Sequence, residues 1–137
     1  MKWTEDLSIG IDIIDNQHKE LFNRINSLLE AIKQHICKDK ISGIIQFLDD
    51  YVHSHFDEEE RYMLKYGYPE YQFHKAQHEH FKKELSALKS ELIKIEGRAK
   101  LGSYELSVIT NQVVVDWILD HIVKIDKQLG KFLQIRI

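Results

Sequence analysis

Seven side chains able to bind metal ions occur at positions that the sequence predicts to be the inner faces of four helices. The pairs His55/Glu59 and His74/His78 are each four residues apart, so on a helix both members of a pair project from one face about a turn apart. Two side chains placed in this way can hold one ion together. The complete candidate set is His18, His55, Glu59, His74, His78, His121 and Asp126.

Each candidate also has an ordinary structural explanation. A single histidine on an apolar face, such as His18, is more often a hydrogen-bonded core residue than a ligand, and one four-residue pair can arise by chance. Burying five imidazoles and two carboxylates without partners would nevertheless cost a large part of the roughly 5–15 kcal/mol by which a domain is stable. Two acids are too few to pair with five protonated histidines, whereas a cluster of metal ions would satisfy all seven side chains.

The number and type of donors favour two ions. Five nitrogens and two carboxylates exceed the four ligands of a tetrahedral structural zinc, and they suit a pair of ions if both acids bridge. Mixed imidazole and carboxylate donors are typical of iron, manganese or zinc sites.

The spacing between His121 and Asp126 does not fit a regular helix. Five residues on an ideal α-helix leave two side chains roughly 140° out of register. If both residues bind the cluster, the helix between them needs a local π-type widening or another distortion, and such bulges are frequent at functional sites.

Apolar periodicity predicts the helices that position these residues, at about 16–36, 42–66, 70–95 and 104–129. Asp15 and Ser103 are expected to cap the first and the fourth helix. Four helices of this length with short connections favour an all-α fold, an antiparallel up-down four-helix bundle. The first fourteen residues and the tail 131–137 are expected to be less regular, and His53 and His80 should face outward.

Composition limits the classes of function. A chain of 137 residues is expected to form a single domain, 1–137, and a net charge of −3 without a basic block argues against nucleic acid as a partner. The apolar runs are far shorter than a membrane span requires, and the polar N-terminus does not resemble a signal peptide. Cys37 is the only cysteine, which fits a reducing compartment, so we expect a cytoplasmic protein with no membrane association.

Four motifs together resemble the hemerythrin family, in particular its single-domain bacterial branch. They cover nearly the whole chain and are highly specific in combination. They are Trp3 ahead of Asp15-Asn16-Gln17-His18, His55-Phe56 leading to Glu58-Glu59, His74-Lys75-Ala76-Gln77-His78, and Trp117-Ile118-Leu119-Asp120-His121-Ile122 followed by Asp126.

The resemblance implies a non-heme di-iron centre with an oxo or hydroxo bridge and dioxygen as its ligand. By the family pattern, one iron is held by His74, His78 and His121, and the other by His18 and His55. Glu59 and Asp126 would bridge the two ions. Phe56, Trp117 and Ile118 would form the apolar wall of the oxygen pocket, and Ile118 departs from the leucine that is usual in the family.

The function implied by the resemblance is reversible dioxygen binding for carriage, storage or delivery, which is not an enzymatic activity. The chain has no Glu-x-x-His sequence, whereas di-iron oxidases on similar bundles typically carry this motif. The alternatives are an oxygen or redox sensing module and a di-iron oxidase or peroxidase. An oxygen-consuming protein of unknown identity is a candidate partner, and the sequence leaves the oligomeric state open.

Overall fold

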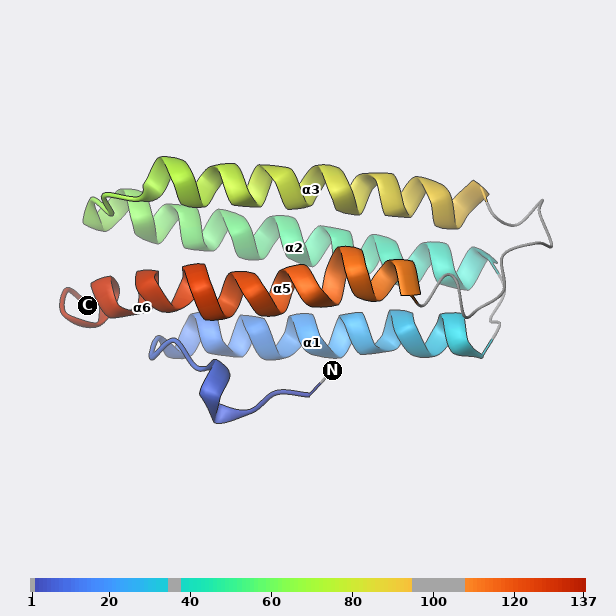
Figure 1. Ribbon diagram of the computed structural model, residues 1–137, viewed down its shortest axis with the longest axis horizontal. Coiled ribbons are helices and arrows are strands. Elements are labelled where there is room, and N and C mark those ends of the chain that lie inside the picture. Colours follow the sequence, from blue (N-terminus) through green and yellow to red (C-terminus); the bar gives the residue numbers. More distant parts are fainter. Residues whose placement is uncertain (1, 35–37, 95–107) are drawn as a thin grey trace.

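Four long helical segments run side by side in the computed structural model, which describes residues 2–34, 38–94 and 108–137 (Figure 1). Segments that follow one another in the sequence run in opposite directions, which confirms the predicted all-α antiparallel bundle. The first three are α1 (Asp12–Lys33), α2 (Lys38–Tyr66) and α3 (Tyr71–Lys94). Within the described residues, the fourth starts at 108 and comprises η3 (Asn111–Val115), α5 (Asp116–His121), η4 (Ile122–Asp126) and α6 (Lys127–Gln134).

The apolar stripe of each helix forms the core of the bundle. On α1 the spacing of three and four residues places Leu21, Ile25 and Leu28 inward, each at most 1% exposed. The candidate ligands continue these stripes, so the packing that buries the apolar side chains also buries the ligands. His53 and His80 face outward as predicted, with side chains 50% and 63% exposed.

The turn between α2 and α3 depends on a glycine. Gly67 has a φ of +67°, a left-handed conformation that glycine adopts without steric cost. The backbone N–H of Gly67 donates to Leu64 O, and that of Tyr68 donates to Met63 O at 2.8 Å. These two bonds form a Schellman motif that ends α2 and turns the chain towards α3.

Asp15 does not cap α1, contrary to the prediction. The helix begins at Asp12, about four residues earlier than expected, and Ile11 occupies the N-cap position without a side-chain hydrogen bond. The Asp15 carboxylate instead accepts a bond from Ser8 Oγ at 2.6 Å and one from the backbone N–H of Ile9 at 2.8 Å. Asp15 therefore holds the N-terminal segment, which contains the short 3₁₀ helix η1 (Glu5–Leu7), against the bundle.

The prediction of an irregular tail from residue 131 was also wrong, because α6 continues to Gln134. Gly130, which directly follows the predicted end of the fourth helix at residue 129, is a buried helical residue without positive φ. A Cβ atom at this position would lie 2.1 Å from Ile9 O, so the glycine allows the N-terminal segment to approach the helix backbone. Gln134 Nε2 donates to the same carbonyl at 3.0 Å.

Replacement of Gly130 with alanine should therefore destabilise the protein by about 1–3 kcal/mol, because the added methyl group forces Ile9 away from α6. Gly43→Ala is the matched control: Gly43 lies in α2 with no atom within 4 Å of an added Cβ, and alanine there should stabilise by about 0.5–1 kcal/mol. Urea denaturation of both variants measures the difference. Equal changes in the free energy of unfolding for the two variants would contradict the close approach of Ile9 to Gly130.

Some of the predictions concern other parts of the chain. Those for Cys37 and Ser103, and for helix ends at residues 36, 95 and 104, fall outside the described residues. Within the described part, none of the helices combines the length and the apolar character needed to cross a bilayer.

Candidate metal centre

The structure brings all seven candidate ligands together in the interior of the bundle. Each is at most 4% exposed. Every one of the four helical segments contributes: His18 comes from α1, His55 and Glu59 from α2, His74 and His78 from α3, His121 from α5 and Asp126 from η4.

The position of Asp126 depends on a π-helical segment. η4 covers Ile122–Asp126 and directly follows His121, which confirms the predicted widening between these two residues. A π-helical turn contains one more residue than an α-helical turn, so residues five apart lie on one face about a turn apart. His121 Nε2 and Asp126 Oδ1 are consequently 3.1 Å apart. A second π segment, η3, was not predicted.

Three of the histidines form the three-histidine subsite, which comprises His74, His78 and His121. Glu59 Oε1 lies 3.3 Å from His74 Nε2 and 3.0 Å from His78 Nε2. Asp126 Oδ1 lies 3.0 Å from His74 Nε2 and 3.1 Å from His121 Nε2. One ligand atom from each of these five residues can be chosen so that all lie within 4.8 Å of one another, a spacing that suits a single ion.

The other two histidines form the two-histidine subsite, which comprises His18 and His55. Glu59 Oε2 lies 3.4 Å from His18 Nε2 and 3.2 Å from His55 Nε2, and Asp126 Oδ2 lies 3.1 Å from His18 Nε2. Each carboxylate thus directs one oxygen to each subsite. This arrangement allows both acids to bridge a pair of ions.

Several polar atoms of the cluster have no hydrogen-bond partner within the described part of the chain. They include both oxygens of Glu59, both oxygens of Asp126, and Nε2 of His18 and His78. Leaving such atoms unsatisfied in the core is costly. Because these atoms converge on one small volume and are carboxylate oxygens and imidazole nitrogens, the residues present fit metal cations.

The carboxylates dominate the protonation of the metal-free cluster. Burial alone would lower the pKa of His18, but the Asp126 and Glu59 carboxylates raise it from 6.5 to about 9. The same two acids outweigh burial at His74 and raise its pKa from 6.5 to about 10. At His121 burial prevails, and the pKa is lowered.

The histidines have the reciprocal effect on the two acids. Burial would raise the pKa of Glu59, but contacts with His55, His18 and His74 hold it well below its usual value. Burial and Glu59 would likewise raise the pKa of Asp126, and contacts with His121 and His18 lower it. Protons on the imidazoles therefore balance the carboxylates without metal, and metal cations would displace these protons.

Two residues that the sequence analysis missed contact the outer nitrogens of candidate ligands. Gln17 Oε1 lies 2.7 Å from His55 Nδ1, and Glu60 Oε2 lies 2.9 Å from His78 Nδ1. Burial would raise the pKa of Glu60, but the bond to His78 lowers it. Gln17 directly precedes His18 in the sequence, and Glu60 directly follows Glu59. These positions indicate that both residues lie near the cluster, but they do not indicate which imidazole each one contacts.

Aromatic rings cover the histidine cluster on one side. The Phe56 ring, 1% exposed, stacks on His78 with centroids 3.8 Å apart and planes 3° apart, and it also lies near His55. Trp117 stacks on His121 with centroids 4.4 Å apart and planes 12° apart. Ile118 is 2% exposed. These three residues are the ones predicted to line the oxygen pocket. Phe56 and Ile118 are buried and Trp117 is partly buried, so together they form an apolar wall beside the cluster.

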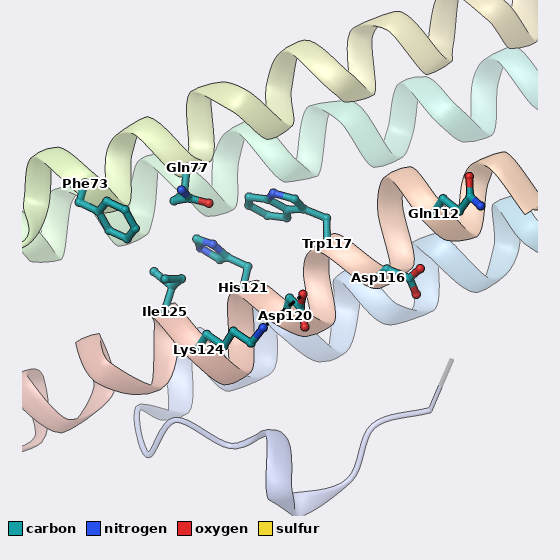
Figure 2. A pocket seen from close by; sticks show the side chains of 9 residues that line it. All are labelled: Phe73, Gln77, Gln112, Asp116, Trp117, Asp120, His121, Lys124 and Ile125. Atoms are coloured by element: carbon teal, nitrogen blue, oxygen red, sulfur yellow. Dashed lines mark ion pairs between the residues drawn. The ribbon is translucent and has the colours of Figure 1, made fainter.

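A surface groove of about 390 Å³ lies beside this wall, between α3 and the fourth helical segment. Trp117 and His121 line it together with Phe73 and Gln77 of α3 (Figure 2). Of the three residues predicted to line the oxygen pocket, Trp117 lines this groove, and Phe56 and Ile118 do not.

Comparison with known proteins relates the sequence and the fold to one family. The family model described as hemerythrin HHE cation binding domain matches residues 9–133. The bacteriohemerythrin of Clostridium acetobutylicum is 33% identical over 129 residues, which cover 92% of this chain and 95% of that relative. The bacteriohemerythrin of Methylococcus capsulatus is 32% identical and covers 95% of this chain and 94% of its own. A crystal structure of wild-type hemerythrin has a TM-score of 0.81 at 30% identity and covers 97% of both chains.

Proposed function

Because the chain belongs to the hemerythrin family, we propose that it binds dioxygen reversibly at two non-heme iron ions held by the buried metal centre. The three-histidine subsite would hold one iron and the two-histidine subsite the other. The observation that carries this proposal is that Glu59 and Asp126 each direct one oxygen to each subsite. When bound, a ferrous pair would supply the two electrons and the coordination position that dioxygen requires.

The two subsites offer different numbers of protein donors. Counting both carboxylates in each, the three-histidine subsite provides five residues and the two-histidine subsite provides four. The two-histidine subsite therefore leaves more coordination positions for a small ligand. We place the oxygen ligand at this subsite.

The surroundings of the cluster support binding over consumption of dioxygen. Five of the seven proposed ligands are imidazoles, which are neutral when they bind a metal, and the wall beside them consists of Phe56, Trp117 and Ile118. Apolar side chains carry no protons to deliver, and reductive cleavage of dioxygen needs protons. Carriage, storage or delivery of dioxygen is therefore the role we propose.

Optical oxygen cycling tests this function. Iron-loaded protein is reduced under anaerobic conditions, exposed to oxygen, and then freed of oxygen, and the cycle is repeated while iron per chain is measured. We expect two irons per chain and a visible absorption band that appears with oxygen and disappears on its removal over several cycles. A band that forms once and decays irreversibly would contradict reversible binding and would favour an oxidase or a redox sensor.

A further inference from the structure

The outer nitrogens of the five candidate histidines have unequal partners. His78 Nδ1 faces the Glu60 carboxylate at 2.9 Å, whereas His55 Nδ1 faces the neutral Gln17 amide oxygen at 2.7 Å. Among the described residues, Nδ1 of His18, His74 and His121 has no hydrogen-bond partner. One imidazole in the three-histidine subsite therefore contacts an anion, and its counterpart in the two-histidine subsite contacts a neutral group.

We propose that Glu60 is a positioning residue that makes the three-histidine subsite bind metal more tightly, so that this subsite is filled before the two-histidine subsite. The inference rests on the proposed two-ion centre. A carboxylate that accepts the Nδ1–H of His78 keeps the lone pair on Nε2, which faces Glu59 Oε1 at 3.0 Å. The negative charge of Glu60 also makes the His78 imidazole a stronger electron-pair donor to a metal ion.

The environment of Glu60 distinguishes it from an ordinary surface acid. Its side chain is 12% exposed, and its partner His78 is fully buried. Phe56 stacks on a face of the same imidazole, and Glu60 contacts Nδ1 at its edge, so packing fixes the plane of the ring and Glu60 fixes its tautomer. Gln17 orients His55 in a similar way but adds no charge, because an amide is neutral.

The chain offers a matched control on the same helix. Glu58 lies two residues before Glu60, its side chain is 18% exposed, and it pairs with Arg61 on the outside of α2. Glu58→Gln removes the same charge from a position two residues away on the same helix without touching an imidazole. Gln17→Glu is the reciprocal variant, because it places a carboxylate against the histidine of the two-histidine subsite.

Zinc titration of the metal-free protein tests the proposal, with a competing chromophoric chelator as indicator. Zinc suits imidazole and carboxylate donors and does not react with dioxygen. We expect two binding steps in the wild type. Glu60→Gln should weaken the tighter step roughly 10-fold and Glu60→Ala up to roughly 100-fold, with little change in the weaker step. Gln17→Glu should strengthen the weaker step, and Glu58→Gln should change neither.

A spectroscopic measurement separates positioning from a general effect of charge or folding. In the zinc-loaded protein, ¹⁵N NMR of the histidine rings should show the His78 Nδ1–H protected from solvent exchange. This protection should persist in Glu60→Gln, which keeps an acceptor, and disappear in Glu60→Ala. Equal zinc affinities for Glu60→Gln and Glu58→Gln, or equal weakening of both steps, would overturn the role of Glu60. A wild type that binds no pair of zinc ions would instead refute the two-ion centre itself.

Discussion

Replacing Glu59 with alanine is expected to abolish the proposed oxygen binding and to reduce iron from the proposed two ions per chain to one or none. Glu59 contacts four of the five candidate histidines at 3.0–3.4 Å and reaches both subsites, whereas Asp126 contacts three. Iron analysis and optical oxygen cycling of the variant measure the loss.

The same substitution should also destabilise the metal-free protein. At pH 6, below the raised pKa values of about 9 for His18 and about 10 for His74, both imidazoles are protonated. Removing a buried partner from such charges typically costs about 3–5 kcal/mol. Urea denaturation of metal-free protein at pH 6 measures this cost.

Glu58→Ala is the control for both effects of Glu59→Ala. It removes an acid from the adjacent position, where the carboxylate pairs with Arg61 near the surface. Iron content should be unchanged, and the free energy of unfolding should change by no more than about 0.5 kcal/mol. If Glu59→Ala still bound two irons and released oxygen reversibly, the bridging role assigned to Glu59 would be wrong.

The metal-free and the iron-loaded protein should respond to pH in opposite directions above pH 6.5. A histidine whose pKa is raised on folding stabilises the protein fully below its unfolded pKa, and this stabilisation is lost as pH rises through the folded pKa. For His18 and His74 the loss extends from 6.5 to about 9 and about 10. The raised pKa of His78 acts in the same direction, and the lowered pKa of His121 opposes it.

The metal-free protein should also lose stability as the pH falls into the acidic range. The pKa values of Glu59 and Asp126 are well below their unfolded values of 4.5 and 3.8, so their stabilisation is present above those values and is lost as pH falls. Metal-free stability should therefore be greatest at about pH 5–6.5 and decline in alkali, where each raised histidine contributes up to about 1.4 kcal/mol per pH unit.

The iron-loaded protein should gain stability over the range in which the metal-free protein loses it. Metal binds deprotonated imidazoles, so protons compete less as pH rises, and bound metal stabilises the folded state by mass action. Thermal melts of both forms between pH 6 and 9 test whether their melting temperatures change in opposite directions. A metal-free melting temperature that rises across this interval would show that the histidines are not held protonated by the two carboxylates.

Much of the site could be predicted from the sequence because its main constraints are local. A spacing of four residues places His55 with Glu59, and His74 with His78, on one face of any α-helix. The five-residue spacing from His121 to Asp126 conflicts with that geometry, and this conflict correctly predicted the π segment η4. The bundle also followed from apolar periodicity and the lengths of the helices.

The residue types at positions 15 and 130 are typical of helix ends but also fit other roles. The tertiary structure decided which role each residue has. Asp15 has the residue type and position of an N-cap, but its carboxylate binds Ser8 and Ile9 because the N-terminal segment folds back over the bundle. Gly130 has the residue type of a helix end, but it lies within α6, where Ile9 O approaches too closely for a side chain. In both cases the partner lies in the N-terminal segment before α1. Apolar periodicity within a helix carries no information about contacts with that segment.

The family resemblance implied the division of the histidines into two subsites, but the atomic geometry of these subsites came only from the tertiary structure. The sequence predicted that the five histidines and Glu59 converge, because each lies on the inner stripe of its own helix, and Asp126 joins them through the π segment η4. Which oxygen of Glu59 faces which histidine, and whether His78 meets Glu60 and His55 meets Gln17, depends on how the helices are rotated and shifted against one another. These rotations and shifts result from side-chain packing across the whole core, which the spacing along any single helix does not encode.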